Sequence, residues 1–135
     1  MILTVTINPL LERRYYYTNV DLSSVNRNAN VIIKVGGKGI NISRQLNKLG
    51  IKNVALLFTG GNNGKLIRES LQNEKIVFSD ILTKSESRDA AVVIDQTLKK
   101  TYSFFRAESE LSSQEIENFI AKMEKMIATC EMVVF

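Results

Sequence analysis

The stretch GGKGINISRQLNKLG, residues 36–50, joins an apolar strand-like segment to an amphipathic one. From residue 40 onward, Ile42, Leu46 and Leu49 recur at helical spacing, and polar residues fill the positions between them. Gly50 provides a C-terminal stop for this helix. The stretch therefore predicts a glycine-rich loop followed by a helix whose apolar face packs on a sheet.

The residues alone leave two interpretations of the glycines open. Gly36 and Gly37 let backbone N–H groups approach a ligand closely, and the N-terminus of a helix favours anions. Lys38 adds positive charge, and Asn41 offers both a donor and an acceptor from the first helical turn. The same residues also fit a purely structural turn, because glycine between a strand and a helix is common.

Two familiar phosphate-binding motifs do not fit. The dinucleotide fingerprint requires a third glycine at the position of Ile42 and an acidic residue at the end of the following strand, and both are missing. The segment GGNNGK, residues 60–65, resembles a P-loop but has one residue too few between its glycines. Leu66 also follows the lysine where Ser or Thr would hold magnesium. We interpret 60–65 as a structural turn in which glycine permits positive φ and close helix approach.

Strands and helices alternate on both sides of the opening stretch. The apolar runs at 2–7 and 53–58 are typical of strands buried in a parallel sheet. Residues 64–73 have helical periodicity, and Ser112 with Glu115 forms a capping box that begins another helix. The predicted inward stripes of these two helices are Leu66, Ile67 and Leu71, and Ile116, Phe119, Ile120, Met123 and Ile127. This order predicts an α/β core with right-handed crossovers.

A second group of strands is set apart from this core. The tyrosine-rich segment 13–20, the run 28–35 and a hairpin over 88–107 have strand-like composition with polar turns. The apolar residues 132–135 begin a further core strand with no covering segment after it, so we expect the N-terminal part of a larger protein. We predict a core over 1–8, 36–86 and 107–135, and a small β-lid over roughly 9–35 and 87–106.

Composition narrows the chemistry. With 44% hydrophobic and 24% charged residues, the chain is typical of a globular protein. It has neither a membrane-length apolar run nor a leader, so we expect a cytoplasmic protein that does not bind membranes. The single Cys130, interpreted as a core thiol, and the lack of histidine exclude disulfides, Cys/His zinc sites and histidine triads. The net charge of +4 is scattered among 14 acidic residues, so nucleic acid is not an expected partner.

The opening stretch resembles the N-terminal signature of the ribokinase-like PfkB sugar kinases. It is most similar to the branch that contains 1-phosphofructokinase and tagatose-6-phosphate kinase. That branch has T-x-N-P-x-x-D after the first strand, x-N-R before the glycines and T-R at a later lid strand; this sequence has TINPLLE at 6–12, VNR at 25–27 and SR at 87–88. The resemblance implies a ribokinase-like parallel sheet, a β-lid that serves as a homodimer interface, and ATP-dependent phosphate transfer to a sugar or sugar phosphate.

The resemblance also implies a substrate site. Backbone groups of the glycines and the Asn41 side chain would contact sugar hydroxyls, and Arg88 would meet the phosphate already on the substrate. Arg27 would assist across the dimer interface. Without the resemblance, Arg88 is typical of an exposed strand arginine. The implied substrate-binding residues are Glu12, Arg27, Gly36, Gly37, Lys38, Asn41 and Arg88.

The sequence departs from the family pattern in ways that affect the chemistry. Glu12 replaces the family's aspartate and is longer by one methylene, about 1.5 Å, and displacements near 1 Å can cost about 10²-fold where geometry matters. Ser87 replaces the threonine before the lid arginine. The family's G-A-G-D-type motif, which supplies the base and the surrounding nucleotide contacts, lies far downstream and is absent from 1–135. We therefore identify no catalytic or metal-binding residue, expect ATP and Mg²⁺ to bind mainly outside the chain, and expect the chain alone to be inactive.

Three functions remain in competition. The first is a kinase acting on fructose 1-phosphate or tagatose 6-phosphate, with this chain carrying the sugar-binding half and the lid. The second is a kinase for a free sugar or nucleoside, against which Arg88 argues. The third is a truncated, non-catalytic sugar-binding or interaction module. The tyrosines at 15–17 favour interface packing over sugar stacking.

Overall fold

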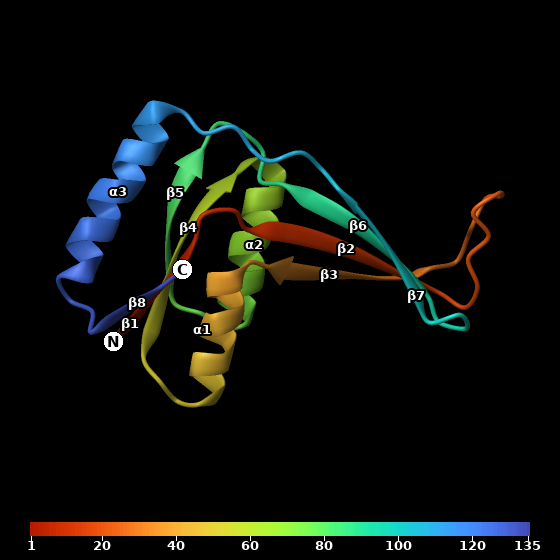
Figure 1. The fold of residues 1–135 in the computed structure, drawn as a ribbon, viewed down its shortest axis with the longest axis horizontal. Helices are drawn as coiled ribbons and strands as arrows, with labels where there is room; N and C mark the ends of the chain where they lie inside the picture. Colours follow the sequence, from red (N-terminus) through yellow and green to blue (C-terminus); the bar gives the residue numbers. More distant parts are fainter.

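The computed structural model describes all of residues 1–135, which form eight strands and three helices (Figure 1). The strands are β1 (Ile2–Thr6), β2 (Leu10–Tyr17), β3 (Asn30–Gly36), β4 (Asn53–Gly60), β5 (Phe78–Thr83), β6 (Asp89–Asp95), β7 (Lys100–Phe105) and β8 (Met132–Val134). The helices are α1 (Lys38–Lys48), α2 (Gly61–Asn73) and α3 (Ser113–Ile127). A parallel core sheet has the order β5-β4-β1-β8, and a lid sheet has the order β3-β2-β6-β7.

Helices cover both faces of the core sheet, α1 and α2 on one face and α3 on the other (Figure 1). β4 is apolar on both faces, and successive side chains of a strand point to opposite faces, so this strand can pack against helices on either side. Ala55 and Leu57 pack in the cluster on the α1 and α2 face, while Leu56 and Phe58 pack in the cluster on the α3 face. Phe58 stacks on Phe119 of α3, with ring centroids 4.3 Å apart. The predicted α/β fold class is confirmed.

β3 belongs to the lid sheet, so α1 leads from the lid into the core. The core sheet differs from the prediction in one strand. The parallel unit of the core is β4-α2-β5, and β5 was missing from the prediction. This strand lies at the edge of the sheet and carries Ser79 and Asp80, so its short apolar pattern is interrupted.

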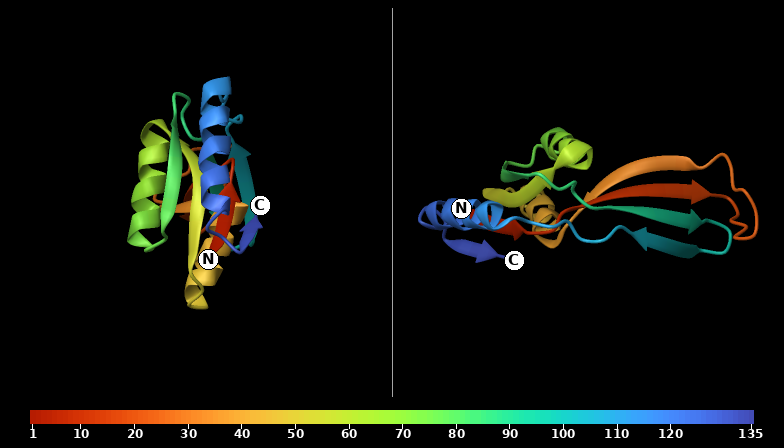
Figure 2. Two further views of the ribbon diagram at one scale, coloured as in Figure 1. Left: turned by 90° about the vertical axis from the view of Figure 1, so that its left-hand side faces the viewer. Right: turned by 90° about the horizontal axis from the view of Figure 1, so that it is seen from above.

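The lid sheet extends away from the core as a separate layer (Figure 2). Its central strand β2 runs antiparallel to β3 and parallel to β6, so that Arg13 lies between Ile33 and Ala91. β6 and β7 form the predicted hairpin. Apolar side chains on the two edge strands remain exposed: Val31, Ile32, Ile33, Phe104 and Phe105.

The buried face of α1 is rotated from the predicted one. Gly39, Ile40 and Ser43 are buried, whereas Leu49, predicted to face inward, is 72% exposed. The close approach of the helix start to β1 sets this face, since a Cβ on Gly39 would lie 2.4 Å from the carbonyl oxygen of Val5. Glycine at this position therefore lets the helix pack against the strand backbone.

The predicted stripe of α3 is only partly inward. Phe119 is buried and Met123 packs beside it, but Ile116, Ile120 and Ile127 are 43%, 45% and 40% exposed. Among the sheet strands, α3 makes its main contacts with β5, so only a narrow line of its surface is covered. Cys130 is half-buried against the same apolar cluster. None of the three helices combines the length and apolar character needed to cross a membrane.

Candidate functional site

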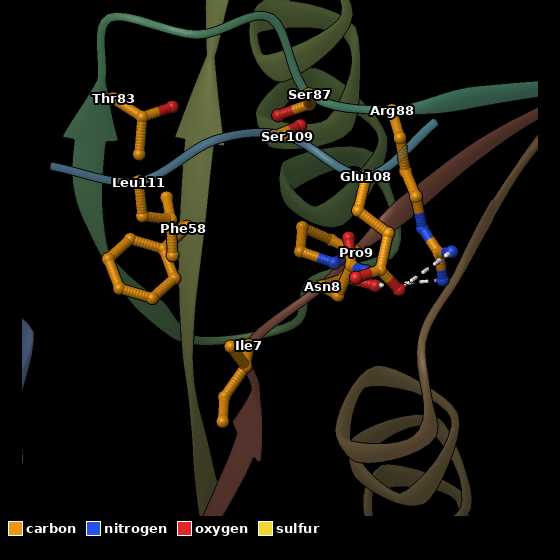
Figure 3. Close-up of a pocket in the computed structure, with 10 residues that line it drawn as sticks. All are labelled: Ile7, Asn8, Pro9, Phe58, Thr83, Ser87, Arg88, Glu108, Ser109 and Leu111. Carbon is orange, nitrogen blue, oxygen red and sulfur yellow. Dashed lines mark hydrogen bonds and ion pairs between the residues drawn. The ribbon is translucent and has the colours of Figure 1, made fainter. Parts of the chain in front are cut away.

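A cleft opens where the carboxyl end of β1 meets the start of α1 and the base of the lid. In parallel α/β sheets, this edge is where ligands bind. The cleft encloses about 460 Å³, which is within the range of small-molecule sites. The residues that line it are Val5, Thr6, Ile7, Asn8, Gly37, Lys38, Asn41, Arg88, Glu108 and Phe135. A second hollow beside it shares Arg88 and Glu108 (Figure 3).

Thr6 fixes the start of α1 at the wall of this cleft. Its Oγ1 accepts a hydrogen bond from the backbone N–H of Ile40 at 3.0 Å. Gly37 has φ 133°, and a Cβ there would lie 2.5 Å from Thr6 Cγ2, so only glycine fits without strain. The first N–H groups of a helix have no intrahelical partners and carry partial positive charge. The wall formed by Gly37 and Lys38 is therefore suited to an anion or to hydroxyl oxygens.

The guanidinium of Arg88 is under-bonded. Its Nη2 donates to the carbonyl oxygen of Asn8 across a long 3.4 Å, and its Nη1 lies 4.0 Å from Glu108 Oε1 (Figure 3). Its Nε is buried without a hydrogen-bond partner. A guanidinium has five N–H donors and pairs well with carboxylate or phosphate oxygens. Arg88 can therefore bind an additional oxyanion in the cleft.

Glu12 lies beside the cleft and is held by the lid. Arg14 Nε and Nη2 each lie 2.7 Å from Glu12 Oε2. This hydrogen bond raises the pKa of Arg14 above its ordinary value. Glu12 Oε1 lies against Gly36, where a Cβ would be 3.4 Å away. Neither Glu12 nor Gly36 is among the cleft-lining residues, so the structure places both next to the site rather than within it.

Asn41 and Arg27 are in contrasting positions. Asn41 lines the cleft, and its Oδ1 accepts a hydrogen bond from Arg44 Nη1 at 2.7 Å. Arg44 is in turn paired with Glu74, and this pairing lowers the pKa of Glu74. Arg27 is exposed and belongs to the loop between β2 and β3, and this loop lies at the far end of the lid (Figure 1). Four of the predicted residues, Gly37, Lys38, Asn41 and Arg88, therefore line the same cleft, whereas Arg27 does not.

Sequence reasoning did not single out three polar residues of the cleft, Thr6, Asn8 and Glu108. Thr6 and Asn8 lie within the TINP motif, so their positions in the motif could have indicated them. Glu108 lies in the loop between β7 and α3, where no periodicity or motif marks it. Only the folded chain brings its carboxylate to Arg88.

Residues 60–65 do not form a phosphate loop. They are the end of β4 and the first turn of α2, which begins at Gly61 rather than at residue 64. A Cβ on Gly60 would lie 1.9 Å from the carbonyl oxygen of Ser85, and one on Gly61 would lie 2.1 Å from Glu86 Oε2. Gly61 also has φ +62°. The chain itself fills the space over these glycines, in agreement with the structural interpretation.

Comparisons with known proteins agree with this geometry. The family described as pfkB family carbohydrate kinase matches residues 10–134. A structure described as a possible 1-phosphofructokinase from Thermotoga maritima superposes with a TM-score of 0.89 and 28% identity, covering 98% of this chain and 43% of that one. Escherichia coli phosphofructokinase-2 in complex with fructose-6-phosphate gives 0.84 and 22%, covering 92% and 41%. Giardia lamblia ribokinase gives 0.74 and 12%, covering 98% and 43%. The chain spans about two fifths of the length of these proteins.

Proposed function

Because the chain belongs to the pfkB family of carbohydrate kinases, we propose that it is the sugar-binding half and lid of a sugar-phosphate kinase. The substrate would be a phosphorylated ketohexose, fructose 1-phosphate or tagatose 6-phosphate, and the second phosphate would come from ATP. The observation that carries this proposal is the under-bonded guanidinium of Arg88, in the same cleft as the start of α1. The proposed setting is the cytoplasm.

The two ends of such a substrate match two parts of the cleft. A phosphate has three acceptor oxygens and suits the planar donor fork of Arg88. Sugar hydroxyls both donate and accept, and they suit the side-chain amide of Asn41 and the backbone at Gly37. A free sugar or nucleoside would leave the guanidinium without a strong acceptor, which is why we favour a phosphorylated substrate.

The lid supports a proposal of a homodimer. Its two edge strands, β3 and β7, expose apolar side chains that include Ile32, Ile33 and Phe104, and an exposed edge strand of this kind can pair with another chain. Arg27 belongs to the loop between β2 and β3 and does not line its own cleft. In a dimer formed through the lids, it would approach the cleft of the partner.

The residues of this chain do not fit ATP. The only glycine-rich turn besides the α1 loop is closed by its own neighbours, Ser85 and Glu86. We propose that ATP and its Mg²⁺ are held mainly by residues outside 1–135, and that the isolated chain binds substrate without phosphorylating it. Its own contribution would be to bind the sugar, orient it and cover it with the lid.

One observation favours a second candidate, a non-catalytic sugar-binding module. Arg14 holds the carboxylate of Glu12 at the lid, and this carboxylate stands where the family's sugar-binding aspartate is expected. A sugar would therefore lose one acceptor unless Glu12 turns toward it. This second candidate uses the same binding cleft as the proposed kinase. It differs from the kinase only in that the longest natural form of the protein would not transfer phosphate.

Calorimetric titration of the chain with fructose 1-phosphate, tagatose 6-phosphate, free fructose and inorganic phosphate tests the proposal. We expect a phosphorylated sugar to bind more tightly than fructose. R88Q should weaken its binding by about 10- to 100-fold, the equivalent of one charge-assisted hydrogen bond. R106Q removes the same charge from an exposed lid residue outside the cleft and should change this affinity little. Equal affinity for fructose, or unchanged binding in R88Q, would contradict the proposal.

A further inference from the structure

Glu108 brings a negative charge to the mouth of the cleft. Its carboxylate lies 4.0 Å from Arg88 Nη1, and it lines both hollows that Arg88 lines (Figure 3). Its side chain is 79% exposed, so the ion pair is loose and costs little to break. A carboxylate and a phosphate present the same kind of oxygen to a guanidinium. Glu108 therefore occupies a position from which it competes with an anionic ligand for Arg88.

The backbone on either side of Glu108 is tied down. Ser109 Oγ donates a hydrogen bond to the carbonyl oxygen of Glu86 at 2.6 Å, and the N–H of Arg106 donates to the carbonyl oxygen of Asp89 at 3.0 Å. Leu111, farther along, packs against the apolar cluster of the core. The loop thus keeps the Glu108 side chain near the cleft even when its ion pair with Arg88 is broken.

We propose that Glu108 is a specificity-determining residue: an internal anion that competes for Arg88 and lowers the affinity of the cleft for phosphorylated ligands. The proposal rests on the proposed function, because it takes the substrate phosphate to bind at Arg88. When the phosphate binds, Glu108 swings into solvent and remains within a Debye length of the ligand, about 10 Å at 0.1 M salt. A neutral ligand such as a free sugar does not meet this competition.

Titration of an E108Q variant measures the effect directly. Glutamine keeps the size of the side chain and removes its charge. Fructose 1-phosphate and inorganic phosphate should bind about two- to fivefold more tightly to E108Q than to the wild-type chain, as expected for one exposed ion pair. The gain should shrink at 1 M salt, where the Debye length falls to about 3 Å. The affinity for free fructose should not change.

E110Q is the matched control. Glu110 lies two residues away in the same loop, is exposed and does not line either hollow. The inference is supported if the wild-type chain binds phosphorylated ligands and E108Q, but not E110Q, binds them more tightly. If the wild-type chain binds them but E108Q has the same affinity, or E110Q shows the same increase in affinity, the inference is overturned and the proposed function is left intact. Failure of the wild-type chain to bind any phosphorylated ligand overturns both. Circular dichroism melting of each variant checks that the fold is unchanged.

Discussion

At the scale of single residues, the carboxylate of Glu12 is held by its neighbour Arg14. Glu12 and Arg14 lie on the same face of β2, because residues two apart on a strand share a face. The ion pair between them takes up the carboxylate that would otherwise extend into the cleft. In this chain the carboxylate of Glu12 therefore has Arg14 as its partner.

A double-mutant cycle on E12Q and R14Q tests this pairing. Both side chains are less than one third exposed and their charged atoms lie 2.7 Å apart, so we expect a coupling free energy of unfolding of about 0.5–1 kcal/mol. The cycle on Lys65 and Glu69, which lie 3.9 Å apart on the surface of α2, should show weaker coupling. Urea unfolding of the wild-type chain, which both cycles share, and of the six variants supplies the free energies. Equal coupling in the two cycles would count against the pairing.

The glycines at 60 and 61 yield a second prediction at this scale. G60A places a methyl group against the carbonyl oxygen of Ser85 and should lower the free energy of unfolding by about 3 kcal/mol, the upper end for overpacking. Gly50 has φ +69° but open space around it, so G50A should cost only about 1 kcal/mol. Urea midpoints compare the two variants. A G60A variant as stable as G50A would show that residues 85–86 do not pack on these glycines.

At the scale of elements, the start of α3 is tied to the chain segment that leaves β5. The Ser112 and Glu115 side chains form the predicted capping box, and Glu115 Oε1 also accepts a hydrogen bond from the backbone N–H of Lys84 at 2.8 Å. These backbone hydrogen bonds, from Ser112 first and then Lys84, lower the pKa of Glu115 below its ordinary value of 4.5. One carboxylate thus holds the helix start and the connection from core to lid.

This arrangement predicts a specific acid sensitivity. Because the folded-state pKa of Glu115 is lowered, its contribution to stability is present above pH 4.5 and is lost as the pH falls through the folded-state value. E115Q should be less stable than the wild-type chain at pH 7, and the difference should narrow as the pH falls below 4.5 and through the lowered folded-state pKa. Urea unfolding across this range measures it. E117Q, which changes an exposed carboxylate on the same helix, is the control, and a difference that stays constant with pH would refute the assignment.

The sequence predicted elements better than it predicted their faces and partners. Periodicity located all three helices and seven strands, because buried runs and capping boxes are local signals. The pattern could not show that β2 lies beside β6, since this pairing joins residues distant in the sequence, such as Arg13 and Ala91. From the sequence we interpreted the glycines at 60–61 as a turn, because glycine is required both where a chain turns and where two segments pack closely.

In the candidate site, too, residues in local motifs were predicted from the sequence, and a residue defined by a long-range contact was not. Gly37 and Asn41 belong to a contiguous motif and were found from the sequence, as was Arg88 through the family resemblance. Glu108 was not, because its role depends only on its distance from Arg88 in the fold. Sequence patterns thus indicated the loop that lines the candidate cleft, while the structure was needed to find the carboxylate beside Arg88.

At the scale of the whole molecule, the chain passes between the core and the lid four times: from β1 to β2, from β3 to α1, from β5 to β6 and from β7 to α3. Ion pairs of Asp89 with Arg13 and Arg106 reinforce the base of the lid. Arg13 also donates to Asn63 Oδ1 of α2 at 3.0 Å. The lid is thus a braced sheet, so it can present a fixed surface to a partner.

Sedimentation of lid variants tests the proposed homodimer. Ile32 and Ile33 are adjacent on β3 and therefore point to opposite faces of the lid. We expect the wild-type chain to sediment as a dimer and either I32K or I33K to convert it to a monomer, which would identify the face that is buried. I120K, at an exposed position on α3, should remain dimeric. A monomeric wild-type chain, or dimers in both lid variants, would contradict the proposal.

A coupled ATPase assay with fructose 1-phosphate tests the proposal that the chain binds substrate without phosphorylating it. We expect the 135-residue chain to bind the sugar phosphate but to show no ADP release above background, because its glycine segment at 60–65 is closed to a nucleotide. Measurable turnover that is lost in R88Q would show that the chain holds a complete site.

The pairing of β2 with β6 has a consequence during synthesis. β2 and β3 can form a hairpin as soon as they leave the ribosome, but the other edge of β2 waits for residues 89–95. At roughly 5–20 residues per second, the ribosome takes several seconds to deliver them. During that interval the nascent hairpin presents the open edge of β2, the kind of edge that chaperones protect and that aggregates recruit. The order of translation, more than the finished fold, therefore sets when this protein is most vulnerable.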